Sequence, residues 1–231
     1  MEFANDFSRR SFLGLAAATG AGIGWLTSVC AAGEAAQSAL AAEALQPLRY
    51  ESLPGFLSKE QLALHHGKHY GGALKALLSI EGRVYGGDGV ADGAARRELG
   101  KAQSEKANSV ILHELYFAGM RSEANDPTET ITEAIKRRFG SLDRWRADLE
   151  MCALAANGWA MLAVHPVNGK LYHIVSDAHD VGPLWLARPL VLIDMYEHAY
   201  YVDYKNDKSA YVKAWFDRID WKEADRRYQA S

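Results

Sequence analysis

The amino-acid sequence predicts an α+β fold in which an N-terminal helical hairpin precedes a C-terminal domain of helices around a small three-stranded antiparallel sheet. Two long segments in the first half of the chain carry apolar side chains at helical spacing, with a glycine-rich stretch between them. After Gly158 the pattern changes to short apolar runs, two of which flank Asn168-Gly169, a strong hairpin signal. We therefore assign residues 46–124 to the helical hairpin and residues 125–231 to the C-terminal α/β domain.

Composition limits the classes of protein that the chain can represent. It has 231 residues, 48% hydrophobic and 24% charged, with a formal net charge of −3. This is the composition of a globular protein, and the slightly acidic balance argues against nucleic acid as a partner. The only two cysteines are Cys30 and Cys152, so neither a disulfide framework nor a cysteine-rich zinc site can be built.

The first 41 residues have the layout of an export signal. Arg9-Arg10 precede a mildly apolar run of small residues from Leu15 to Ala32, an arrangement that resembles a twin-arginine signal peptide. The alternative is a retained membrane anchor, but threonine and glycine interrupt the run, which makes it weak against the roughly 20 apolar residues that a span needs. Ala39-Leu40-Ala41 offers a cleavage site. We expect the twin-arginine export machinery to export the protein, residues 1–41 to be cleaved off as the signal peptide, and the protein to be periplasmic or extracellular.

Two long helices are expected in the hairpin. The first begins at Ser58, which can cap it together with Gln61 as a capping box, and continues to Ile80 before Gly82 ends it. A glycine-rich connection follows. The second helix runs over Ser104–Arg121, where apolar residues again recur at helical spacing.

The helices and strands expected in the C-terminal domain follow one another in three groups. Two helices come first, followed by three strands and then by two or three further helices that reach the end of the chain. The expected helices cover Glu129–Phe139 and Ser141–Ala156, and the expected strands cover residues 159–166, 170–177 and 188–196.

Histidine and acidic side chains occur at positions where a fold could gather them. His65 and His69 stand four residues apart on one helix face. His113 lies in the apolar part of the second helix, and Asp194 ends a buried strand four residues before His198. Each has a simpler explanation when taken alone: a solvated helix face, a core histidine, a helix N-cap. Together they predict a site for a borderline transition metal such as Fe, Mn or Zn, because buried polar groups need partners.

At these residues the chain resembles the iron/manganese superoxide dismutases. The resemblance covers about residues 46–228, and its pieces stand in the family's order: "LPGFLSKEQLALHHGKHY", "ILHELYF", "NGWAMLAV", "DMYEHAYYVDYKN" and "YVKAWFDRIDW". It implies an enzyme that converts superoxide to dioxygen and hydrogen peroxide with one Fe or Mn ion per subunit. It also implies a homodimer or a dimer of dimers.

The resemblance implies a role for nine residues of this sequence. The four protein ligands of the metal would be His65, His113, Asp194 and His198. The other five would surround the metal: His69 at the mouth of the substrate funnel, Tyr201 as its hydrogen-bond partner across the dimer interface, Glu197 reaching the partner subunit's metal ligand equivalent to His198, Trp159 as a wall of the metal pocket, and His179 hydrogen-bonded to the metal-bound solvent.

Four positions depart from the family's pattern. Ala73 stands where a funnel tyrosine is usual, Ser109 stands where some iron enzymes place a glutamine, and Phe117 and Tyr196 replace tryptophans. Because of Ala73, a metal-binding protein of the same fold with little turnover remains an alternative. Two further alternatives are a zinc hydrolase and a helical interaction protein with incidental histidines. The sequence leaves open iron against manganese and dimer against tetramer.

Overall fold

A computed structural model describes residues 38–230 except residues 88, 91 and 183. The predicted signal peptide lies outside the described residues, apart from residues 38–41. The described residues belong to one compact unit, and the predicted boundary near residue 125 stays a prediction. Within this part of the chain, the helices are too short or too polar to cross a membrane.

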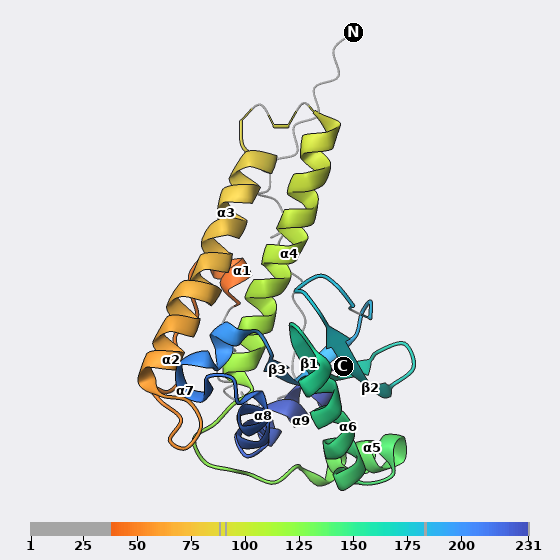
Figure 1. Ribbon diagram of the computed structural model, residues 1–231. Coiled ribbons are helices and arrows are strands. Elements are labelled where there is room, and N and C mark those ends of the chain that lie inside the picture. Colours follow the sequence, from red (N-terminus) through yellow and green to blue (C-terminus); the bar gives the residue numbers. More distant parts are fainter. Residues whose placement is uncertain (1–37, 88, 91, 183, 231) are drawn as a thin grey trace, which may run out of the picture. The chain divides into compact units, whose positions relative to one another are not determined.

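The helical hairpin forms as predicted. Its first arm is one continuous rod made of α2 (Lys59–Leu64), the π-helical segment η1 (His65–Tyr70) and α3 (Gly71–Tyr85). The second arm, α4 (Gly93–Ala118), packs alongside α3 (Figure 1). The hairpin therefore brings the stretch of the first arm that carries His65 close to the stretch of the second arm that carries His113.

The turn of the hairpin is shorter than predicted. Gly82 does not end the first arm, because the helix continues to Tyr85 and buries Val84. That burial outweighs the roughly 1 kcal/mol by which a glycine disfavours a helix relative to alanine. The second arm begins at Gly93 rather than Ser104, because the Asp92 side chain caps its first turn.

The second arm also ends earlier than the predicted Arg121. Its last helical residue is Ala118, after which Met120 leaves the helix and forms an isolated antiparallel bridge with Ile219. The side chain of Met120 is 1% exposed. A long-range backbone pairing, which local spacing cannot reveal, thus decides this boundary.

Two helices follow at almost the predicted positions. They are α5 (Glu129–Phe139) and α6 (Leu142–Ala155). The side chains of Thr128 and Ser141 accept hydrogen bonds from the first turns and fix where each helix starts. Both helices pack against the sheet, which confirms the mixed helix-and-sheet architecture of this half.

The sheet has three antiparallel strands, as predicted, and the structure places them in the order β2-β1-β3. They are β1 (Trp159–His165), β2 (Lys170–Ser176) and β3 (Arg188–Asp194). The central strand β1 is buried along nearly its whole length. Its register on β3 pairs Trp159 with Asp194, so the buried end of β3 lies beside an indole ring.

Short and regular helices complete the chain. In order they are η2 (Glu197–Ala199, a 3-10 turn), α7 (Tyr201–Tyr204), α8 (Lys208–Phe216) and α9 (Trp221–Gln229). The α-helices α7, α8 and α9 agree with the two or three helices expected after the sheet, and the 3-10 turn η2 was not predicted.

The buried Arg227 of α9 ties two halves of the fold together. Its guanidinium donates to the backbone carbonyl of Leu190 in β3 at 3.1 Å and to that of Leu115 in α4 at 3.0 Å. The carboxylate of Glu223 balances its charge at 2.9 Å. A guanidinium in this fork geometry fixes both carbonyls at once, so strand β3 and helix α4 are held at a set separation.

The short helix α1 (Ala39–Ala42) was not predicted and packs on α4. The carboxylate of Glu114 accepts hydrogen bonds from the Ser38 hydroxyl at 2.8 Å and from the Ala39 backbone N–H at 2.6 Å. It also accepts from the hydroxyl of Tyr70 at 2.9 Å. Residues assigned to the end of the signal peptide thus contact the body of the protein.

Candidate metal centre

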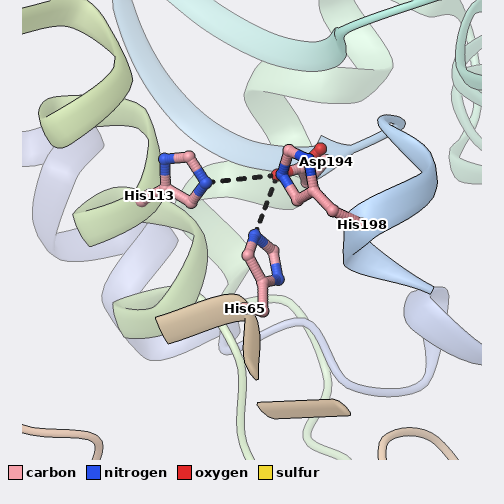
Figure 2. Close-up of side chains that lie close together, drawn as sticks. All are labelled: His65, His113, Asp194 and His198. Atoms are coloured by element: carbon pink, nitrogen blue, oxygen red, sulfur yellow. Dashed lines mark hydrogen bonds and ion pairs between the residues drawn. The ribbon is translucent and has the colours of Figure 1, made fainter. Parts of the chain in front are cut away.

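Four side chains from four elements meet in the interior (Figure 2). His65 comes from η1, His113 from α4, Asp194 from the end of β3, and His198 from η2. The Nε2 atoms of His65, His198 and His113 lie 3.1, 3.3 and 3.6 Å from Oδ2 of Asp194. One donor atom from each residue lies within 4.8 Å of those of the others. The fold therefore assembles the predicted set of four ligands.

The first arm of the hairpin presents its histidines through a π-helical segment. His65 opens η1 and His69 lies in its last turn. Their rings are 6.2 Å apart, so the i, i+4 relation holds across the irregular turn. π-Segments occur as single turns within α-helices and are frequent at functional sites. The sequence pattern predicted a plain helix here and missed this segment.

Asp194 is held by the backbone around it. The Tyr196 backbone N–H donates to Oδ1 at 2.9 Å, which leaves Oδ2 directed at the imidazoles. The hydroxyl of Tyr211 donates to the Asp194 backbone carbonyl at 2.9 Å and shares a second hydrogen bond of 2.9 Å with the hydroxyl of Tyr116. Hydrogen bonds thus fix both the carboxylate and the backbone of Asp194.

The tautomer of His113 indicates a cation between the four groups. Its Nδ1–H donates to the Ser109 backbone carbonyl at 2.7 Å, so a neutral ring carries a lone pair on Nε2. That lone pair is buried, has no hydrogen-bond partner among the described residues, and lies 3.6 Å from the Asp194 carboxylate. Two acceptors facing each other in a dry interior repel one another. A metal ion between them removes the repulsion.

The electrostatics agree with this donor set. Burial lowers the pKa of His113 to about 3, with His65 adding to the effect. Burial likewise lowers the pKa of His65. Burial opposes ionisation of Asp194, but the ring nitrogens of His198 and His65 hold its pKa well below the usual range. At neutral pH His65 and His113 are therefore neutral imidazoles and Asp194 is an ionised carboxylate, the protonation states that metal ligands require.

Gln61 positions His198 and was missed as a site residue. The sequence suggests that Gln61 completes a capping box with Ser58, and the Ser58 hydroxyl does accept from the Gln61 N–H at 3.1 Å. The Gln61 side chain, however, is fully buried and donates to the His198 backbone carbonyl at 2.7 Å. It also accepts from the Val202 N–H at 3.0 Å. Its role depends on a partner 137 residues away, so no local pattern could have found it.

Trp159 sets the protonation pattern of His179. The indole Nε1–H donates to Nδ1 of His179 at 3.0 Å. Burial lowers the pKa of His179, so the ring is neutral at pH 7 and carries its hydrogen on Nε2. The ring centroid lies 5.9 Å from that of His113. The structure thus places both residues next to the four-residue cluster.

The other three predicted site residues lie on the outer side of the cluster. His69 is exposed, and its ring stacks on that of His198 with centroids 3.8 Å apart. Desolvation on this packed side, followed by the charges of His198 and His65, lowers the pKa of His69 to about 4. Glu197 is exposed, and Tyr201 is 47% exposed. Their roles across a subunit interface stay predictions.

The four residues that depart from the family's pattern lie in the elements around the cluster. Ser109 is buried and uses its backbone carbonyl to orient His113. Phe117 packs 5.0 Å from the ring of His65, and Tyr196 stacks 5.2 Å from that of His198. Ala73 is buried in α3, one turn beyond His69.

Comparisons with known proteins point to the same family as the sequence motifs. Residues 127–227 match the model of the C-terminal domain of iron/manganese superoxide dismutases. The chain is 33% identical over 189 residues to superoxide dismutase [Mn] 2 of Haloferax volcanii, covering 79% of this chain and 92% of that protein. It is 34% identical over 190 residues to superoxide dismutase [Fe] of Aquifex aeolicus, covering 79% and 88%. Superoxide dismutase [Fe] of Methanothermobacter marburgensis is 32% identical over 192 residues, covering 79% and 93%.

The cluster predicts how metal content responds to substitution. Asp194→Ala removes the only carboxylate of the cluster, so we expect bound iron or manganese to fall from about one ion per chain to nearly none. His113→Ala should have the same effect. Elemental analysis after dialysis measures the content. His165→Ala is the matched control, because that histidine lies outside the cluster and hydrogen-bonds the Trp185 carbonyl. Full metal content in Asp194→Ala would disprove the ligand assignment.

Proposed function

This chain belongs to the iron/manganese superoxide dismutases and converts superoxide to dioxygen and hydrogen peroxide, and we propose that it does so outside the cytoplasm as a homodimer or a dimer of dimers. The activity rests on one observation above all: three imidazoles converge on a single buried carboxylate. This donor set suits one Fe or Mn ion per subunit, and the relatives named for manganese and for iron are equally similar to the chain.

The chain's contribution to dismutation is a dry, preorganised site with one open side. A bound Fe or Mn ion supplies the one-electron chemistry by alternating between its trivalent and divalent states. The side chains of His65 and Asp194 are fully buried and that of His113 is 1% exposed, whereas that of His198 is 18% exposed. His69 is exposed beside it. We infer that superoxide approaches past His69 and His198.

His179 is our candidate for the residue that controls the supply of protons beside the metal. Peroxide formation consumes two protons, so a donor is needed close to the ion. The hydrogen bond from Trp159 leaves the proton of neutral His179 on Nε2. This N–H can donate to an oxygen ligand and tune the potential of the ion.

The activity and the choice of metal can be tested together. We expect the iron-loaded form, the manganese-loaded form or both to remove superoxide far faster than the same concentration of free metal ion. Asp194→Ala treated in the same way should show only the background rate. Superoxide loss and metal content are measured on the same samples. A form that holds one ion per chain but stays at background would support the alternative of a metal-binding protein with little turnover.

Exposure around the open side supports a dimer. His69, Glu197 and Tyr201 are polar or amphipathic, lie beside a buried metal centre, and are all exposed in the single chain. In our proposal Glu197 accepts a hydrogen bond from the partner subunit's His198, and Tyr201 pairs with the partner subunit's His69. Each subunit would then complete the other's site.

Glu197→Ala tests the interface. Removing one partner of a buried, hydrogen-bonded charge pair weakens association by about 2–5 kcal/mol. We therefore expect the variant to dissociate at micromolar concentrations at which the parent protein remains dimeric. Analytical ultracentrifugation measures this change. Glu123→Ala, an exposed glutamate in the segment between α4 and α5, should leave the association unchanged. A fully active monomeric parent protein would rule the proposal out.

Export is supported by Arg9-Arg10 ahead of an apolar run of small residues. Twin-arginine export carries folded proteins, so the metal can be acquired before translocation. The site of cleavage has structural consequences. Cleavage after Ala41 would remove Ser38 and Ala39, both of which hydrogen-bond Glu114, whereas cleavage before Ser38 would keep these contacts.

Replacing Arg9 and Arg10 by lysine tests the export route. We expect the precursor to accumulate in the cytoplasm, while the parent protein is recovered from the periplasm or the medium. Cell fractionation separates these outcomes, and N-terminal sequencing of the exported form identifies the cleaved bond. Unchanged export of the double-lysine variant would contradict the twin-arginine route.

A further inference from the structure

A second group of metal-binding side chains lies away from the redox centre, between α6 and the edge strand β2. It consists of Asp148 and Cys152 of α6 and His173 of β2. One donor atom from each lies within 4.8 Å of those of the other two. Asp148 and Cys152 are four residues apart, so they share a helix face, and that face packs against β2.

His173 is held firmly and directs one ring nitrogen at Asp148. Its side chain is 5% exposed and stacks on Phe139 with ring centroids 4.4 Å apart. Nδ1 lies 2.5 Å from the carboxylate of Asp148. Nε2 is buried and finds no hydrogen-bond partner in the described part of the chain. Nδ1 is therefore the ring nitrogen that faces Asp148 and can bind an ion, and Nε2 carries the hydrogen of the neutral ring when it does.

The thiol of Cys152 completes the donor set. It forms no disulfide in the described residues and is partly buried. Thiolate, imidazole and carboxylate are the donors that zinc prefers in proteins, and three protein donors leave a fourth position for water. Such a set is softer than that of the redox centre, which contains no sulfur.

We propose that Asp148, Cys152 and His173 form a second metal site, which binds a borderline divalent ion such as Zn²⁺ and fastens α6 to the edge strand of the sheet. Binding replaces the thiol proton of Cys152 with the metal ion and releases that proton. Because protons compete with the ion for the sulfur, binding should weaken as the pH falls.

The geometry needs only a local adjustment. In tetrahedral zinc sites the nitrogen and oxygen donors stand about 2.0–2.2 Å from the ion, which separates them from each other by roughly 3.4 Å. The Asp148–His173 contact of 2.5 Å must therefore widen. The side chain of Asp148 is 51% exposed, so it can rotate outward, whereas the stacked imidazole stays in place.

Cobalt provides a direct test on the iron- or manganese-loaded protein. Co²⁺ substitutes for Zn²⁺, and its bond to a thiolate gives a charge-transfer absorption that the sulfur-free redox centre cannot produce. We expect the protein to bind one additional Co²⁺ ion per chain and to show this absorption. Excess Zn²⁺ should then displace the Co²⁺ and abolish the absorption. Asp148→Asn should lower the affinity by about tenfold or more. Cys152→Ser should eliminate this absorption band. The variant should keep its dismutase activity, which would show that it is folded.

Two control variants identify the source of the band. Cys30→Ser, made in the uncleaved precursor, removes the other cysteine of the chain. His165→Ala removes a histidine of the neighbouring strand β1, whose ring is hydrogen-bonded to the Trp185 carbonyl. Both should retain the band. The proposal is overturned if the parent protein shows no thiolate–cobalt absorption, or if the absorption survives Cys152→Ser. Asp148 and His173 would then be only a hydrogen-bonded pair joining the helix to the strand.

Discussion

The buried carboxylate of Asp194 is the constraint on which the rest of the structure depends. It is fully removed from solvent and holds its charge there. An ionised carboxylate in a protein interior is tolerated only when other groups compensate its charge, because the desolvation penalty amounts to several kcal/mol. Here one oxygen is satisfied by a backbone N–H of Tyr196, and the other faces three imidazoles. The arrangement is complete only with a cation at the point where the four groups converge.

The scaffold keeps these groups in place by linking distant segments through buried polar side chains. Arg227 joins the strand that carries Asp194 to the helix that carries His113. Gln61 joins the first hairpin arm to the turn that carries His198. Each of these side chains satisfies backbone groups in two elements at once. This explains why long polar residues, rather than apolar ones, occupy these core positions.

The two candidate metal sites differ in the way the protein builds them. The redox centre draws on four elements and lies in the interior, so its donors are fixed and largely shielded from water. The proposed second site draws on one helix face and one edge strand, and its carboxylate is half exposed. A preorganised site suits an ion whose potential must be controlled. A partly open site between surface elements suits a structural ion.

The sequence by itself determined the fold class, the order of the main helices and strands, and the four residues of the redox centre. Periodicity gave the two arms of the hairpin, and Asn168-Gly169 marked the turn between the first two strands. These signals are local, because a helix or a hairpin is encoded within a few residues. The likeness of stretches such as "DMYEHAYYVDYKN" to one family then connected histidines and an aspartate that are far apart in the chain.

The tertiary structure decided everything that depends on partners distant in sequence. It ended α4 at Ala118 through the pairing of Met120 with Ile219, and it redirected Gln61 from a helix cap to the backbone of His198. It fixed the tautomers of His113 and His179 through Ser109 and Trp159. It also brought Cys152 to His173. These features arise from packing between elements, where burial and unsatisfied polar groups, rather than local propensity, select the conformation.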